Sequence, residues 1–302
     1  MIISKKGTLF EMRVSKEYEG KTVDDIFRTI WKAPKKWIHS IRMAGEVKVN
    51  NQKANWNAPL KEGDLLHFPL FYEENYGVIP SFYHIEILYE DEHLLVANKP
   101  AGMDTHPNEE GQTGTLANAV AYHLQMNGEL CKVQHIHRLD RDTTGAVLFA
   151  KNQLSGPLLD RMLSERKIKR TYWALADGLI GPKKGTINKP IGRDRHHALR
   201  RRVSPSGQDA VTHFRVLKKI PSERLSFIEC TLDTGRTHQI RVHLSDMGHP
   251  LAGDKLYGGS SRFRRQALHA RFLEFTHPLS GEFIHCEASF LDEPPIFENV
   301  IE

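Results

Sequence analysis

The chain has 302 residues, more than one compact core usually spans, so we expect one large domain and one small one. Hydrophobic residues make up 39% and charged residues 26%, an ordinary globular composition that excludes wholesale disorder. Lysine and arginine outnumber aspartate and glutamate by 42 to 37, which gives a net charge of +5. The surplus gathers at residues 32–36, 161–170 and 193–202, and such clusters are typical of surfaces that bind nucleic-acid phosphates, with plain solvated faces as the alternative.

The first 75 residues predict a small α+β unit. Apolar residues alternate over 9–14, which indicates a strand, and recur at helical spacing over 23–31. Thr22 is placed to cap that helix, and a second helix is predicted over 34–43. Strands are predicted at 45–52, which runs into an Asn-Asn turn, and at 65–68. Residues 69–84 show no clear periodicity and are interpreted as a connection, with the linker at 76–84.

The rest of the chain alternates short strands with a few helices. The predicted helices cover residues 116–124, 154–166 and 237–247. The predicted strands cover residues 85–89, 93–98, 146–151, 170–176, 210–217, 225–232, 267–275 and 283–289. Many strands and few helices indicate an α+β fold with a mixed, largely antiparallel sheet, and argue against a regular doubly wound fold. We therefore expect a small domain at 1–75 and a large domain at 85–302.

The cysteines and the N-terminus indicate a protein that stays inside the cell. The three cysteines lie far apart and form no Cys-x-x-Cys pair, so neither a disulfide framework nor a structural zinc site is supported. The N-terminus lacks the apolar stretch of a signal peptide, and no segment approaches the ~20 apolar residues that cross a bilayer. We expect a soluble cytoplasmic monomer with no membrane partner.

A dense charged segment at 135–145 precedes the predicted strand at 146–151. Asp140 has Arg138 and Arg141 as close neighbours, and two cations would keep its carboxylate ionised, as a nucleophile or base requires. An ordinary ion pair in a turn is the alternative and prevails for an isolated Arg-Leu-Asp. The potential metal ligands are His135, His137, Asp140 and Asp142. Their order departs from the His-x-His-x-Asp-His pattern of metallo-hydrolases, so we expect no metal.

A second dense segment at 232–244 opens the helix predicted at 237–247. Thr237 is suited to cap this helix, whose free amides favour an anion. Ile240, Leu244 and Met247 fall on one helix face and are expected in the core. Arg241 lies about 100° around the helix from Ile240. An arginine beside a core face requires a partner carboxylate.

These two segments resemble the signature motifs of the RluA-type pseudouridine synthases: His-Arg-Leu-Asp at 137–140 and Thr-Gly-Arg-Thr-His-Gln-Ile-Arg at 234–241. Three further matches are Asn-Lys-Pro-Ala-Gly at 98–102 with His-Pro at 106–107, Lys-Arg-Thr-Tyr-Trp-Ala at 169–174, and Gly-Asp-Lys-Leu-Tyr-Gly at 253–258. Five motifs in the family's order, within residues 85–290, are far more specific than any one alone. The helix pair and hairpin at 35–64 resemble the S4-like RNA-binding domain.

The resemblance implies an enzyme that isomerises uridine within RNA after flipping the nucleotide into a pocket. Such an enzyme needs no cofactor. The implied catalytic residues are Asp140, as nucleophile or base, Arg241, as its ion-pair partner, and Tyr172, which stacks on uracil. The implied substrate-binding residues are His106, Arg236, Ile240 and Arg138, the last in the space vacated by the flipped base.

Two other classes of protein compete with this enzyme. A catalytically silent RNA-binding or ribosome-assembly protein on the same scaffold would share the basic clusters and the front domain. The intact set of Asp140, Tyr172 and Arg241 favours the enzyme. A metal-dependent hydrolase using some of the 17 histidines fails on ligand spacing. Among RNA partners, the front domain favours ribosomal RNA, with tRNA as the alternative.

Overall fold

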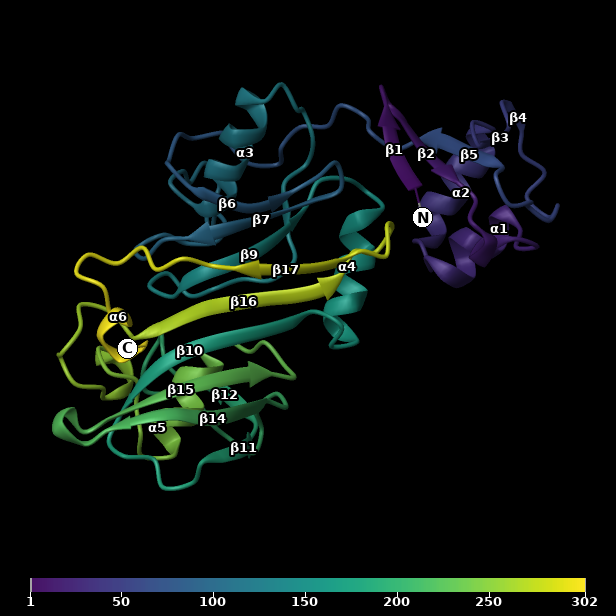
Figure 1. Cartoon of the computed structure of the whole chain (residues 1–302). Coiled ribbons are helices and arrows are strands. Elements are labelled where there is room, and N and C mark those ends of the chain that lie inside the picture. Colours follow the sequence, from purple (N-terminus) through teal and green to yellow (C-terminus); the bar gives the residue numbers. More distant parts are fainter. Residues whose placement is uncertain (1, 302) are drawn as a thin grey trace.

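The computed structural model describes residues 2–301, and its N-terminal part forms a five-stranded antiparallel sheet in the order β1-β2-β5-β3-β4 (Figure 1). The strands are β1 Ile2–Lys6, β2 Leu9–Arg13, β3 Lys48–Val49, β4 Gln52–Lys53 and β5 Leu65–Pro69. The helical segments between β2 and β3 are a 3-10 turn Lys16–Tyr18, α1 Val23–Asp25, a π-helical turn Ile26–Ile30 and α2 Lys35–Ala44. The predicted strand–helix–helix–hairpin order is thus present, while β1 and the π turn were not predicted.

Local sequence explains these boundaries. The Thr22 hydroxyl accepts a hydrogen bond from Asp25 N at 3.0 Å, and the Asp25 carboxylate accepts one from Thr22 N at 2.9 Å. This capping box confirms the predicted start of the helix. Asn50 and Asn51 have φ values of 51° and 66°, a left-handed conformation that asparagine tolerates and that closes the β3–β4 hairpin.

The larger part is built on a ten-stranded sheet whose main path is β11-β14-β15-β10-β16-β9-β7-β6, with β17 on β16 and β8 on β9. Its strands are β6 Glu86–Glu90, β7 Leu94–Lys99, β8 Gln134–His135, β9 Thr144–Ala150, β10 Lys169–Asp177, β11 Lys184–Asn188, β14 Val211–Ile220, β15 Leu225–Leu232, β16 Leu268–Thr276 and β17 Phe283–Glu287. The β9–β16 pair is parallel and the other pairs of this sheet are antiparallel. The expected mixed, largely antiparallel α+β fold is confirmed.

Four helices and a small hairpin complete the described part of this region. The helices are α3 Leu116–Met126, α4 Ser155–Ser164 and α5 Gln239–Asp246, followed by a short α6 Glu298–Ile301. The hairpin pairs β12 Ile191–Arg193 with β13 Arg201–Val203, and 3-10 turns occur at Pro221–Glu223 and Lys255–Tyr257. The sequence did not predict β8, β11, β12 or β13, because these strands are short and lack an alternating apolar pattern.

Gly145 permits the close approach of the two parallel strands. Its φ is +114°, and a Cβ atom there would lie 2.3 Å from the carbonyl oxygen of Ala270 on β16. No other residue fits this position without moving a strand. This close contact fixes the start of β9, and therefore the position of the Asp140 segment, which leads into β9.

Helix α4 joins the two parts of the molecule. Leu154, Leu158 and Leu279 belong to the same apolar core as Phe10 and Trp31 of the N-terminal part. The Arg161 guanidinium on α4 also donates to the carbonyl oxygens of Trp31 and Lys32. The N-terminal part is therefore anchored through α4, which also lines the cavity described below. Within residues 2–301, no helix is both long enough and apolar enough to cross a membrane.

Candidate active site

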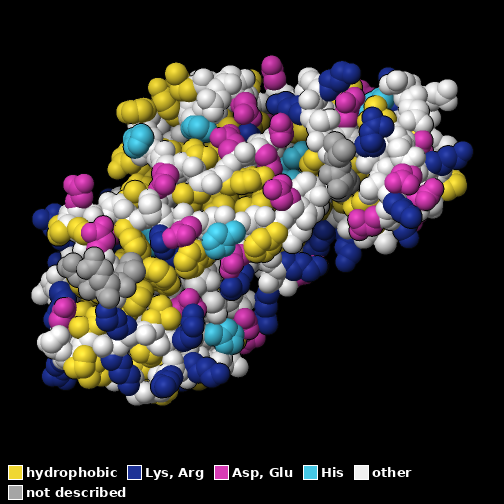
Figure 2. Space-filling view, viewed as in Figure 1, with side chains coloured by type: hydrophobic (Ala, Val, Ile, Leu, Met, Phe, Trp, Pro, Cys, Tyr) yellow, Lys and Arg dark blue, Asp and Glu magenta, His cyan; other side chains and the backbone are white. Residues whose placement is uncertain are grey.

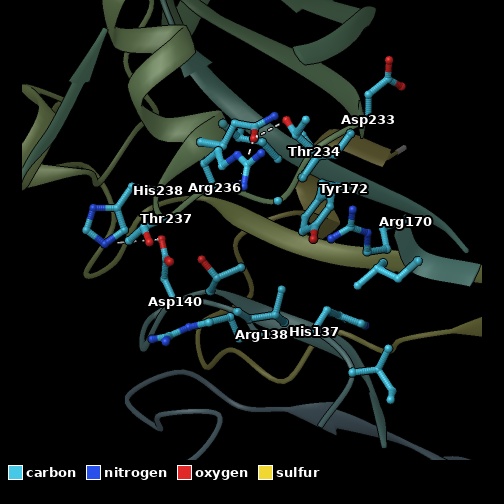
Figure 3. Close-up of a pocket in the computed structure, with 18 of the residues that line it drawn as sticks. His137, Arg138, Asp140, Arg170, Tyr172, Asp233, Thr234, Arg236, Thr237 and His238 are labelled. Atoms are coloured by element: carbon cyan, nitrogen blue, oxygen red, sulfur yellow. Dashed lines mark hydrogen bonds and ion pairs between the residues drawn. The ribbon is translucent and has the colours of Figure 1, made fainter. Parts of the chain in front are cut away.

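A cavity of about 650 Å³ lies where the segment before β9, strand β10 and the start of α5 meet (Figure 3). Its volume falls within the range of about 300–1,000 Å³ that is common for small-ligand sites. The lining residues that carry the argument below are Arg138, Asp140, Arg170, Tyr172, Arg236, His238, Ile240 and Arg241. The cavity thus brings together segments that are more than 100 residues apart in the sequence.

Two buried side chains hold the backbone on either side of Asp140 in place. The Lys99 ammonium, fully buried at the end of β7, donates to the carbonyl oxygens of Arg141 at 2.8 Å and Met103 at 2.7 Å. Burial lowers the pKa of Lys99 to about 7. The Thr105 hydroxyl donates to Leu139 O at 3.0 Å and accepts from Leu139 N at 3.1 Å. These backbone contacts fix Asp140 before any substrate is present.

Arg241 bridges two carboxylates. Its Nη1 donates to Asp140 Oδ2 at 2.9 Å, and its Nε and Nη2 donate to the two oxygens of Asp254 at 2.7 and 2.9 Å. The Asp254 side chain is 1% exposed and that of Asp140 is 21% exposed, so one carboxylate anchors the guanidinium and the other faces the cavity. Burial lowers the pKa of Arg241, but the hydrogen bonds that Arg241 donates to Asp254 and Asp140, together with their negative charges, raise this pKa overall. The sequence required a partner carboxylate for Arg241, and the structure supplies two.

The turn that opens α5 differs from the prediction. Thr237 does not cap the helix: His238 occupies the N-cap position in a left-handed conformation with φ 59° and makes no capping hydrogen bond. Instead, the side-chain oxygen of Gln239, the first residue of α5, accepts a hydrogen bond from the backbone amide of Arg236 at 3.0 Å and so stabilises the turn. The unusual backbone brings His238 Nε2 to 3.9 Å from Asp140 Oδ2.

Tyr257 connects this turn to its surroundings. Its hydroxyl lies 2.8 Å from His238 Nδ1 and accepts a hydrogen bond from Arg201 N at 2.9 Å. Its ring lies beneath the Arg241 guanidinium, 5.0 Å from ring centre to Cζ. Burial lowers the pKa of His238, with Asp140 opposing the shift, so His238 is neutral at pH 7. The hydroxyl of Tyr257 and the neutral imidazole thus support the Asp140–Arg241 pair from one side.

Tyr172 and Arg170 project from the same face of β10 into the cavity, and Figure 3 shows them side by side. Tyr172 is buried, and that burial raises the pKa of its hydroxyl, with Arg170 opposing the shift and Asp140 adding to it. The phenol therefore remains protonated at neutral pH. An aromatic face is available to a planar base at this wall.

The structure brings together all but one of the residues expected at the site. Ile240 is buried in the cavity wall, and the exposed Arg138 and Arg236 lie at its rim. His106 does not line the cavity; its ring stacks behind that of His135 with centroids 4.2 Å apart. The functional candidates that the sequence did not single out are Lys99, Arg170, His238, Asp254 and Tyr257.

The histidines near Asp140 do not form a metal centre. Burial lowers the pKa of His135 to about 4 and that of His137 to about 3, so both are neutral. His137 Nε2 accepts a hydrogen bond from Leu148 N at 3.3 Å, which ties it to β9. Across residues 2–301, no group of three His, Cys, Asp or Glu side chains is placed to hold a metal ion.

Comparisons with known proteins identify the family. The family model described as RNA pseudouridylate synthase matches residues 93–246, and that of the RluD ribosomal pseudouridine synthase N-terminal domain matches residues 10–66. The uncharacterized RNA pseudouridine synthase YhcT of Bacillus subtilis is 50% identical over 289 residues, which are 95% of this chain and 96% of the relative. The ribosomal large subunit pseudouridine synthase D of Nitrosomonas europaea is 43% identical over 219 residues, 69% of this chain and 63% of the relative.

A solved structure agrees with these sequence matches. Human RNA pseudouridylate synthase domain containing 1 superposes with a TM-score of 0.55 and 28% identity, covering 68% of this chain and 83% of its own. The matched regions include the segments that carry Asp140, Tyr172 and Arg241. The expected family is confirmed: this chain belongs to the RNA pseudouridine synthases, isomerases that act on RNA.

Proposed function

We propose that this chain converts specific uridines of structured RNA to pseudouridine, with Asp140 as the essential carboxylate. The observation that carries the proposal is the Asp140–Arg241–Asp254 arrangement at the wall of a cavity that also contains Tyr172. Arg241 donates a hydrogen bond to Asp140 Oδ2, while Asp140 Oδ1 forms no hydrogen bond with any described residue. One carboxylate oxygen is thus fixed and the other is open to a ribose.

The reaction balances without a cofactor. The bond between ribose C1′ and uracil N1 breaks, the base rotates, C5 bonds to C1′, and the proton released from C5 is replaced by one at N1. Asp140 serves this sequence by attacking the sugar or by abstracting a proton, and either role needs an ionised carboxylate. The Arg241 guanidinium donates a hydrogen bond to the Asp140 carboxylate and holds it in place, and the ring of Tyr172 offers a surface on which the flipped uracil stacks.

The surface charge supports an RNA partner. Two basic clusters that the sequence separates by more than 100 residues meet at α4, since Arg161 binds the carbonyl oxygen of Lys32. Figure 2 shows dark blue Lys and Arg side chains along this junction. Exposed members of the combined surface, the α4 basic track, are Lys32, Lys35, Lys36, Arg166, Lys167 and Lys169. Arg166 also lines the cavity, so the track leads from the N-terminal part to the site.

The N-terminal family model and the named relatives favour large-subunit ribosomal RNA as the substrate, over tRNA. Several relatives are named as ribosomal large subunit pseudouridine synthase D, and the N-terminal family model is that of a ribosomal enzyme. We assign residues 1–75 to an S4-like RNA-binding domain, 76–84 to a linker and 85–302 to the catalytic domain. A monomer in the cytoplasm is the form we propose to act.

The test is tritium release from ribosomal RNA transcribed with uridine labelled at C5. Asp140→Asn should lower the rate more than about 1,000-fold, because the essential group is removed, while RNA binding stays within about threefold. Asp142→Asn, in the same segment but without a side-chain hydrogen bond to any described residue, is the matched control and should keep most activity. An active Asp140→Asn enzyme would refute the assignment. A wild-type chain that binds RNA but releases no tritium would favour the silent RNA-binding protein.

A further inference from the structure

Arg170 is a buried charged residue of the cavity that the proposed chemistry does not use. Its residue is 8% exposed, it lines the cavity, and its guanidinium forms no hydrogen bond or ion pair with any residue in the described range 2–301. Every other buried arginine there has a carboxylate partner: Arg241 binds Asp140 and Asp254, and Arg265 binds Asp292. A buried and unpaired guanidinium is costly, so a protein retains one where a ligand supplies the missing partner.

The surroundings of Arg170 are built to leave the guanidinium open to the cavity. A Cβ atom at position 235 would lie 3.1 Å from Arg170 Nη1, so glycine there makes room for the guanidinium. Two carboxylates line the same end of the cavity, but both have other partners. Asp233 pairs with Arg166 at 3.1 Å and with His213 at 3.2 Å, and Asp160 accepts a hydrogen bond from Gln134 at 3.2 Å. Neither carboxylate reaches Arg170.

We propose that Arg170 is a phosphate-binding subsite that holds a phosphodiester of the extruded uridine, an inference that rests on the proposed function. The guanidinium presents parallel N–H groups that match two phosphate oxygens. Arg166 of the α4 basic track lines the same region, where Asp233 holds it at 3.1 Å. The backbone of the RNA enters the cavity here.

Strand geometry places this subsite at a suitable separation from the base. Arg170 and Tyr172 are two residues apart on one face of β10, which corresponds to about 6.6 Å along the strand. If uracil stacks on Tyr172 and the ribose lies at Asp140, the adjacent phosphate extends along β10 toward Arg170. A carbonyl oxygen of uracil is the other acceptor within reach, but a neutral acceptor compensates a desolvated cation far less than an anion does.

The experiment compares three ligands: uridine, uridine 5′-monophosphate and uridine 3′-monophosphate. Their dissociation constants are measured by ligand-observed NMR with the full-length wild type, Arg170→Gln and Arg170→Lys. The wild type should bind at least one of the monophosphates about tenfold more tightly than uridine, as expected for a charge-assisted contact. Arg170→Gln should lose this preference and keep its affinity for uridine, while Arg170→Lys should retain part of the preference.

Folding does not confound this test, because removing an unpaired buried charge should leave the melting temperature of free Arg170→Gln unchanged or higher. The subsite is refuted if the wild type shows no preference for a monophosphate, or if Arg170→Gln retains that preference. It is equally refuted if Arg170→Gln weakens uridine as much as the monophosphates, since the arginine then contacts the nucleoside. Tritium release by the wild type tests the proposed function separately: an active enzyme without phosphate preference overturns the subsite alone.

Discussion

Asp254 is expected to support catalysis although it does not line the cavity. It holds Arg241 through two hydrogen bonds of 2.7 and 2.9 Å, whereas Asp140 contributes one of 2.9 Å. Asp254→Asn keeps the shape of the side chain but removes its charge, and turns an NH2 group toward a guanidinium that can only donate. The Asn oxygen can still accept one of the two hydrogen bonds, and Asp140 is then the remaining carboxylate partner of Arg241.

Two magnitudes follow from this geometry. Removing one partner of a buried ion pair lowers the free energy of unfolding by about 3–5 kcal/mol. Because Arg241 keeps its contact with Asp140, we expect Asp254→Asn to lie at the lower end, with a loss of about 3 kcal/mol. Without its anchor at position 254, the Arg241 side chain can shift toward the cavity and move the Asp140 carboxylate with it. A misplacement of about 1 Å at a reacting group lowers a rate about 100-fold, so we expect a loss of that order in the single-turnover rate.

The assay combines urea denaturation with single-turnover tritium release, at a temperature well below unfolding. Glu90→Gln is the matched control, because buried Lys151 also binds two carboxylates, Glu90 at 2.9 Å and Glu129 at 2.8 Å, outside the active-site cavity. It should lower stability by a similar amount and leave the rate unchanged. A fully active Asp254→Asn enzyme, or equal rate losses in both variants, would show that Asp254 does not position Asp140.

Two further predictions concern the junction between the two parts of the chain. Replacing Lys32, Lys35 and Lys36 by Gln should weaken binding to a ribosomal RNA transcript and reduce the slope of log K against log [salt] by about 0.7–0.9 for each RNA phosphate that these lysines neutralise. Tritium release at saturating RNA should be retained, and an unchanged slope would show that these lysines do not contact RNA. This test is cleaner than deleting residues 1–75, which would expose Leu154, Leu158 and Leu279. His93 packs against Phe10 and Phe71, and burial lowers its pKa to about 4 from 6.5. Because the unfolded chain takes up this proton below pH 6.5 and the native chain does not until about pH 4, stability falls across that window, by about 3 kcal/mol for this group. His93→Phe should show a correspondingly smaller loss between pH 7 and pH 4 in urea titrations, and an identical loss would contradict the assignment.

The fold was largely predictable because its strands and helices carry strong periodic patterns. The strand predicted at 225–232 coincides with β15, and the helix predicted at 34–43 differs from α2 by one residue at each end. The elements that escaped prediction are held by their neighbours. β11 follows the edge of β14, and β8 has two residues that pair with β9, so their conformation comes from tertiary contacts that no local pattern reports.

The chemistry of the site was less predictable, since the sequence shows which residues are charged but not which of them are unpaired. Asp254 and Tyr257 lie in a segment that the resemblance had already matched, but only the structure shows that both contact Arg241. His238 reaches Asp140 only through its left-handed backbone, where the pattern favoured a Thr237 cap. Arg170 looked like one more cation in a basic cluster. Its distinguishing property is the absence of a partner in the described chain, and that property exists only once β10, α4 and Gly235 enclose it.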